Sequence, residues 1–132
     1  MSVTRLDNGE YWLERLKKNH NALETQLCVL QMECHTISVA KGWYEKDNGY
    51  RNPGELIALI HSELSEALEA LRDGNKPDKN LPDHNSLAVE LADAVIRIFD
   101  MAAYMDCDLP SAIIDKMEYN KTRPARHGGK AF

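Results

Sequence analysis

The chain has 132 residues, of which 43% are apolar and 28% charged, so it is predicted to fold as a single globular domain spanning residues 1–132. Its formal net charge of −5 argues against a nucleic-acid partner, because phosphate-backbone binding needs a basic excess. No apolar run approaches the roughly 18 residues that a membrane-spanning helix needs, and no signal peptide is recognisable. These features predict a cytoplasmic protein with no membrane partner.

The three cysteines, Cys28, Cys34 and Cys107, are an odd number and lack the CxxC spacing of zinc sites. We expect them to be reduced thiols, as is usual in a cytosolic protein. They do not predict a zinc site.

The composition favours helix over strand, because aromatic residues make up only 7% and β-branched residues are sparse beside Leu, Ala, Glu and Lys. No apolar run alternates with period two, so no strand is predicted. Residues 1–9 are polar and expected to be frayed. From about 10 to 39, apolar residues recur at spacings of three and four, which predicts a helix that the weak helix formers at 19–21 could kink or break. Residues 42–52 are rich in turn formers and predict a loop.

The second helix is predicted over 53–72. Asn52 is a favourable N-cap, and Pro53 suits the first helical position because its missing N–H would be unpaired there anyway. Gly74 ends this helix and begins a solvated loop over 74–84. Further helices are predicted over about 85–105 and 110–121, followed by a basic, irregular tail over 122–132.

The predicted fold is therefore all-α, a bundle of four to five helices. The helix over 85–105 has a very wide apolar arc, so we expect it to be buried on more than one side. One chain of this length cannot cover both this helix and the long first helix. We therefore expect dimerisation to complete the bundle. Four polar residues lie outside the arc: Glu90, Asp93, Arg97 and Asp100.

Two acid pairs carry the chemistry of the sequence. Glu63 and Glu66 lie at i, i+3 on one predicted helix, and Glu90 and Asp93 have the same spacing on the next, so each pair shares one side of its helix. Because Glu63 also lies at the edge of an apolar stripe, we expect the acids to face a groove. Four neighbouring carboxylates repel one another unless a cation lies between them, and hard oxygen ligands suit Mg²⁺ or Mn²⁺. Magnesium commonly also binds substrate phosphates, which makes a nucleotide polyphosphate the expected ligand.

Two other interpretations compete with this one. Either acid pair alone is most often a solvated helix face. A di-iron bundle is disfavoured because it needs Glu-x-x-His pairs, whereas His61 precedes Glu63 at the wrong spacing.

A basic C-terminal region could supply the counterpart to the phosphates. Lys116 and Asn120 lie at i, i+4 and share a helix face. Arg126 and Lys130 flank a Gly-Gly pair whose backbone N–H groups could converge on an anion. Arg and Lys bind phosphate directly, although an ordinary charged tail is an equal alternative for the residues after 126.

Glu63-x-x-Glu66, followed after 23 residues by Glu90-x-x-Asp93, resembles the ExxE…ExxD signature of the MazG-like all-α nucleoside triphosphate pyrophosphohydrolases. The resemblance covers most of the chain. Arg51-Asn52-Pro53 resembles the entry to the first motif helix of that family, and the helix with Lys116 and Asn120 resembles its last helix. The ending Arg-His-Gly-Gly-Lys is similar to short family members from bacteria and phages, so the location would be the host cytoplasm if the gene is carried by a phage.

The resemblance implies Mg²⁺-dependent cleavage of a nucleoside or deoxynucleoside triphosphate to the monophosphate and pyrophosphate, in nucleotide pool cleaning or remodelling. It makes Glu63, Glu66, Glu90 and Asp93 the metal ligands. A metal-activated hydroxide would attack, and an acid that the metal does not saturate, Glu63 or Glu66, would be the general base. Lys116 and Asn120 would hold phosphates. The resemblance also implies a homotetramer, whereas the helix pattern alone implies a homodimer.

His35 and Trp43 correspond to a His and a Trp that grip the base in related enzymes. Arg97 occupies a position where some relatives carry an aromatic residue, and it could alter base choice or contact a phosphate. The competing interpretations are an ordinary helix residue for His35, a loop anchor for Trp43 and a salt bridge to an acid for Arg97. For the whole protein, the alternative is a non-catalytic helical adaptor or a regulator that binds a nucleotide.

Overall fold

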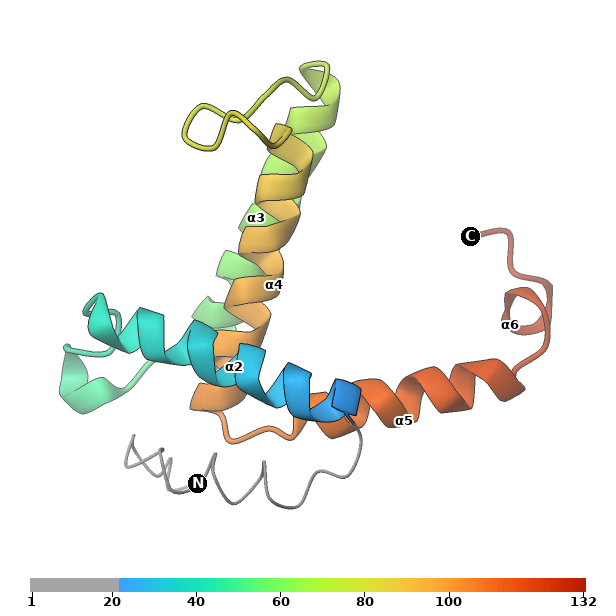
Figure 1. The fold of residues 1–132 in the computed structure, drawn as a ribbon, viewed down its shortest axis with the longest axis horizontal. Helices are drawn as coiled ribbons and strands as arrows, with labels where there is room; N and C mark the ends of the chain where they lie inside the picture. Colours follow the sequence, from blue (N-terminus) through green and yellow to red (C-terminus); the bar gives the residue numbers. More distant parts are fainter. Residues whose placement is uncertain (1–21) are drawn as a thin grey trace.

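A computed structural model describes residues 22–132 of the chain, and this part is all-α (Figure 1). The only pairing of extended backbone there is an isolated bridge between Pro77 and Asn85, so the predicted absence of strands is confirmed for these residues. The part of the first helix before residue 22, with its expected kink, lies outside the described residues. The elements are α2 (Ala22–Ala40), the 3-10 turn η1 (Asp47–Gly49), α3 (Pro53–Arg72), α4 (Ser86–Tyr104), α5 (Leu109–Thr122) and α6 (Arg126–Gly129).

Local sequence signals set the ends of α3 and α4. The side chain of Asn52 accepts a hydrogen bond from the Gly54 N–H at 2.9 Å, and the side chain of Asn85 accepts one from the Ala88 N–H at 2.9 Å. Each bond satisfies an N–H group that the first turn of a helix leaves unpaired. After α3 ends, Gly74 takes a left-handed φ of +85°, a conformation that favours glycine. These caps set the residues at which both helices begin.

The helices α3 and α4 pack side by side and run antiparallel, joined by the loop over 73–85 (Figure 1). Helix α2 crosses α4 near the C-terminal end of α4 and packs against it. Helix α5 packs against α2 and extends away from the α3–α4 pair (Figure 1). The described bundle is therefore open on the side of α5.

The core lies where the loop after α2 meets the first turn of α3 and the end of α4. Tyr44, Leu56 and Tyr104 form a buried cluster, and Val39 and Met101 pack against it. Burying side chains of this size contributes roughly 1.5 to 3 kcal/mol each. This core holds the loop over 41–52 firmly against α4.

A large part of the apolar surface of α3 and α4 is exposed in the single chain. Helix α4 packs against both α2 and α3, as its wide apolar arc predicts, but the arc extends beyond what these two helices cover. The exposed apolar side chains of the α3–α4 pair include Ile57, Leu64, Leu68 and Leu71 on α3 and Leu91, Val95, Ile96 and Ile98 on α4.

Among residues 22–132, no helix is both long and apolar enough to cross a membrane.

The C-terminal region follows the sequence pattern closely. Helix α5 spans Leu109–Thr122, one residue longer at each end than predicted, and the Asp108 side chain caps it by accepting from the Ser111 N–H. The tail is irregular apart from the single turn α6, in which His127 and Gly128 have left-handed φ angles.

Candidate functional site

Three acids converge where α3 and α4 pack together. Glu63 of α3 and Glu90 and Asp93 of α4 each offer a carboxylate oxygen, and these oxygens lie within 4.8 Å of one another. Glu66, one turn after Glu63, lies close enough to Glu90 to raise the pKa of that carboxyl. The antiparallel packing thus brings all four predicted acids into one cluster, which we call the acidic centre.

The acidic centre carries negative charge that its surroundings only partly balance. Burial raises the pKa of Glu90, and the neighbouring Glu66, Asp93 and Glu63 raise it further. Burial also raises the pKa of Asp93. The nearby Glu63 carboxylate raises this pKa further, whereas the Arg97 guanidinium lowers it. Acids whose pKa values are raised by one another are stabilised when a cation enters between them. The donor set is made of hard oxygens only, so these acids could hold a metal ion such as Mg²⁺.

Arg97 is a cation in direct contact with the acidic centre. Its Nε donates to Oε1 of Glu63 at 2.5 Å, and the Glu63 side chain is only 9% exposed. The structure therefore contains an Arg97–Glu63 salt bridge, as the competing interpretation of Arg97 predicted. The predicted substrate contact of Arg97 stays a prediction.

A cleft of about 210 Å³ lies beside the acidic centre. Glu63, Asp93 and Arg97 line it together with Trp43 and Asp100. Trp43 is 58% exposed, so part of it is accessible to a ligand. On α4, Asp93, Arg97 and Asp100 follow one another at i, i+4 and i+7, so they share one helix face. Asp93 and Asp100 are about 10 Å apart along the helix axis. The cleft thus has an acidic centre and, two turns further along α4, a second carboxylate.

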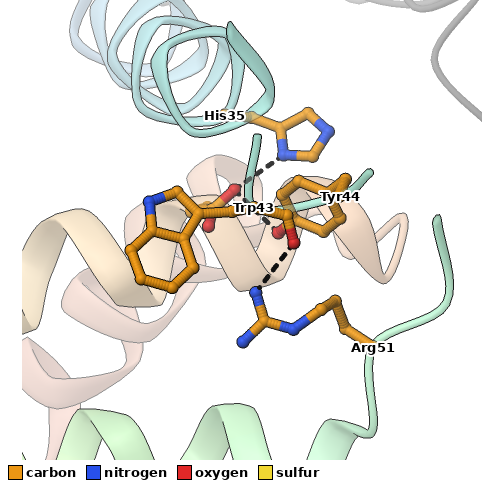
Figure 2. Close-up of polar contacts among 5 residues, drawn as sticks. His35, Trp43, Tyr44 and Arg51 are labelled. Carbon is orange, nitrogen blue, oxygen red and sulfur yellow. Dashed lines mark hydrogen bonds and ion pairs between the residues drawn. The ribbon is translucent and has the colours of Figure 1, made fainter. Parts of the chain in front are cut away.

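Asp100 is fixed by two donors from other elements. Its Oδ1 accepts from His35 Nδ1 at 2.7 Å and from the Tyr44 hydroxyl at 2.9 Å. His35 is 3% exposed and packs edge-on against the Tyr44 ring, so it does not line the cleft (Figure 2). The structure therefore places the predicted base contact His35 behind Asp100, as a support for it. Burial raises the pKa of Tyr44, and the Asp100 charge adds to this, which keeps the hydroxyl protonated as a donor.

Arg51 joins the loop to the same wall of the cleft. Its guanidinium donates to the Trp43 carbonyl oxygen at 3.2 Å and lies 5.9 Å from the Trp43 ring centroid and 5.8 Å from that of Tyr44 (Figure 2). Its backbone N–H donates to the Tyr104 hydroxyl at 2.7 Å, and that hydroxyl donates to the Arg51 carbonyl at 3.2 Å. Trp43 and Arg51 are thereby tied to the end of α4.

The predicted phosphate-binding residues lie apart from this cleft in the single chain. Lys116 and Asn120 are on α5, which extends away from the α3–α4 pair (Figure 1). The Lys116 ammonium lies 4.7 Å from the Tyr119 ring centroid. Arg126 and Lys130 are exposed in the tail. The roles proposed for these four residues stay predictions.

The sequence analysis missed Asp100 and Tyr44 as site residues. Asp100 could have been found, because Asp93, Arg97 and Asp100 follow the spacing of one helix face. Tyr44 gave no such signal, since its position depends on how the loop after α2 folds back. That reversal passes through Gly42, whose φ is +85°.

Comparisons of the chain with protein-family models, with curated proteins and with solved structures found no match. The fold and the site together define a small all-α protein whose acidic centre could hold a metal ion.

Proposed function

We propose that the protein is a Mg²⁺-dependent nucleotide pyrophosphohydrolase, which cleaves a nucleoside or deoxynucleoside triphosphate to the monophosphate and pyrophosphate. The observation that carries the proposal is the convergence of Glu63, Glu90 and Asp93 within 4.8 Å, beside a cleft that is also lined by the exposed Trp43. The resemblance of the two acid pairs to the MazG-like signature supplies the reaction type. The role would be nucleotide pool cleaning or remodelling.

The residues of the acidic centre fit a hard divalent cation. Glu63, Glu66, Glu90 and Asp93 would hold Mg²⁺, with Mn²⁺ as an alternative, because their oxygens are close and the pKa values of Glu90 and Asp93 are raised by crowded negative charge. When bound, such an ion neutralises phosphate charge and lowers the pKa of a bound water.

The chain's own groups would perform the remaining tasks. Glu63 or Glu66 would accept the proton of the attacking water, and Trp43 would stack on the base. Arg97 would contact a phosphate once Glu63 has another counterion. Lys116 and Asn120 would bind the departing phosphates, either from a second copy of the chain or after α5 changes its direction.

The functional form is proposed to be a homodimer or a homotetramer. The supporting observation is the exposed apolar surface of α3 and α4, which includes Leu64, Leu68 and Leu91. Exposed apolar side chains in this number on two packed helices are typical of interfaces between subunits. Sedimentation equilibrium measures the mass directly, and a monomer at micromolar concentration would contradict this part of the proposal.

A non-catalytic regulator that binds a nucleotide is the alternative function. The Arg97–Glu63 salt bridge favours it, because that bridge offsets part of the charge without any metal. Turnover separates the two functions: a regulator binds nucleotide in the presence of Mg²⁺ but releases no pyrophosphate.

The test is pyrophosphate release from the eight common NTPs and dNTPs, with and without Mg²⁺, followed by ion-exchange separation of the products. Monophosphate and pyrophosphate are expected, and release of orthophosphate as the first product would refute the reaction. Glu90→Gln should abolish turnover, whereas Glu69→Gln, an exposed acid on α3 that pairs with Arg72, should not.

The same assay tests the basic residues. Lys116→Ala should lower kcat strongly, because charge on the leaving pyrophosphate develops in the transition state. Arg126→Ala and Lys130→Ala should mainly raise KM, since an exposed tail binds ground state and transition state alike. Unchanged kcat in Lys116→Ala would leave the reaction standing and exclude α5 from the site.

A further inference from the structure

We propose that Asp100 selects the base of the nucleotide by accepting a hydrogen bond from its exocyclic amino group. The site would then prefer cytosine and adenine over their keto counterparts, uracil and hypoxanthine. This inference rests on the proposed function and names the substrate class of the same cleft.

The place of Asp100 in the cleft supports this role. Asp100 lines the same cleft as Glu63 and Asp93, and it lies two turns, about 10 Å, beyond Asp93 on one face of α4. When the phosphates of a nucleotide lie at the acidic centre, its base extends away from them along the cleft. The cleft provides an exposed aromatic residue, Trp43, and the Asp100 carboxylate for that base.

The hydrogen bonds of Asp100 decide which atom meets the ligand. Both of its donors, His35 Nδ1 and the Tyr44 hydroxyl, bind Oδ1. Within residues 22–132, no hydrogen bond of the structure uses Oδ2, although the side chain is only 14% exposed. Oδ2 is therefore the oxygen left for a ligand.

The protonation of this network makes Asp100 an acceptor. Tyr44 keeps its proton because burial and the Asp100 charge raise its pKa, so its hydroxyl donates to the carboxylate. An ionised carboxylate accepts hydrogen bonds and cannot donate them. An amino group of the base satisfies Oδ2, whereas a keto oxygen in the same place would leave two acceptors facing each other.

The expected discrimination is about tenfold to a hundredfold in kcat/KM, the range for leaving a partly buried charged acceptor unpaired. The matched pairs that measure it are dCTP against dUTP and ATP against ITP. In each pair, an exocyclic amino group is replaced by a keto oxygen at the same ring position, and the adjacent ring nitrogen changes from acceptor to donor.

Asp100→Asn should reverse this preference. The two fixed donors, Tyr44 and His35, require an acceptor at the position of Oδ1, so the amide oxygen takes it. The amide NH₂ then faces the cleft in place of Oδ2 and donates to a keto oxygen. Asp115→Asn is the matched control, because it changes an exposed acid on α5 that lies outside the cleft.

The experiment measures kcat/KM for both nucleotide pairs with the wild type, Asp100→Asn and Asp115→Asn, and records the thermal midpoint of each variant. The expected result is a preference for dCTP and ATP in the wild type and in Asp115→Asn, and for dUTP and ITP in Asp100→Asn. Equal kcat/KM within both pairs for the wild type would overturn the inference while the pyrophosphohydrolase function stands. This wild-type measurement needs no variant, so it decides even if Asp100→Asn melts below the assay temperature.

Two further outcomes are equally decisive. A wild-type preference that Asp100→Asn leaves unchanged would assign base selection to another residue and overturn the inference. Absence of turnover with every nucleotide would refute the proposed function itself. In that case, calorimetric titration with dCMP and dUMP in Mg²⁺ still tests Asp100, and equal affinity for the two would overturn its role.

Discussion

Replacing Glu90 with glutamine should stabilise the metal-free protein. Glu90 shares the acidic centre with Glu63 and Asp93, and its pKa is raised by burial and by these neighbours. An acid whose pKa is higher in the folded than in the unfolded state destabilises the fold at neutral pH, because the unfolded chain ionises more readily. Two like charges 4.8 Å apart repel by roughly 0.9 kcal/mol in water and roughly 3.5 kcal/mol at an effective dielectric constant of 20. Glu90 is only half-buried, so solvent screens the repulsion and we expect a value near the lower limit, about 1 kcal/mol.

Thermal unfolding at neutral pH tests this reasoning. A gain of about 1 kcal/mol raises the Tm of a domain of this size by about 3 to 5 °C. Millimolar Mg²⁺ should reverse the order of the two proteins, because a ligand at a hundredfold excess over its Kd stabilises the wild type by about 2.7 kcal/mol and the variant has lost a ligand. Glu69→Gln, with a side chain 70% exposed and outside the centre, should change neither value. A Tm for Glu90→Gln below that of the wild type without metal would make Glu90 a structural residue and refute the argument.

Three further predictions follow from the same structure. The metal-free protein should become more stable as the pH falls from about 7 to about 5, because Glu90 and Asp93 have raised pKa values and take up protons first in the folded state. Urea unfolding at each pH measures this stability, and an unfolding midpoint that falls with pH would contradict the prediction. Arg97→Gln should lower the free energy of unfolding by about 2 kcal/mol, because it leaves the buried Glu63 without its partner. Mg²⁺ should recover part of this loss, and a loss that Mg²⁺ leaves unchanged would show that Glu63 is not a metal ligand. Asn85→Ala should lower the free energy of unfolding by about 1 kcal/mol, because it removes the cap of α4, and it should leave kcat at low temperature unchanged. An unchanged unfolding midpoint in urea would show that the cap is dispensable.

The helices and the acidic pairs could be predicted because their signals are local. Asn52 with Pro53, and Asn85, begin α3 and α4 at the predicted residues, and the observed bounds differ from the predicted ones by at most one residue. The i, i+3 spacing of the acids follows from helix geometry alone. Once α3 and α4 pack as neighbours, the acids on their facing sides meet.

The wall of the cleft could not be predicted because its contacts are long-range. His35 and Asp100 are 65 residues apart in sequence, and Tyr44 and Asp100 are 56 apart. Their meeting depends on where α2 crosses α4, which no periodicity encodes. The exposure of Leu91 on α4 has the same origin, since an apolar arc predicts burial but does not identify the surface that covers it.

The loop over 41–52 is held at two points seven residues apart: Tyr44 binds Asp100, and the Arg51 backbone binds the Tyr104 hydroxyl. Both anchors belong to the last two turns of α4, so this wall and the helix move as one body. A wall of this kind cannot act as a lid, and a ligand meets a shape that exists before it arrives. Preformed sites spend little of their binding energy on ordering the protein, so no rearrangement of the loop should slow association. The Arg51 amide hydrogen should exchange with solvent as slowly as those of α4 itself.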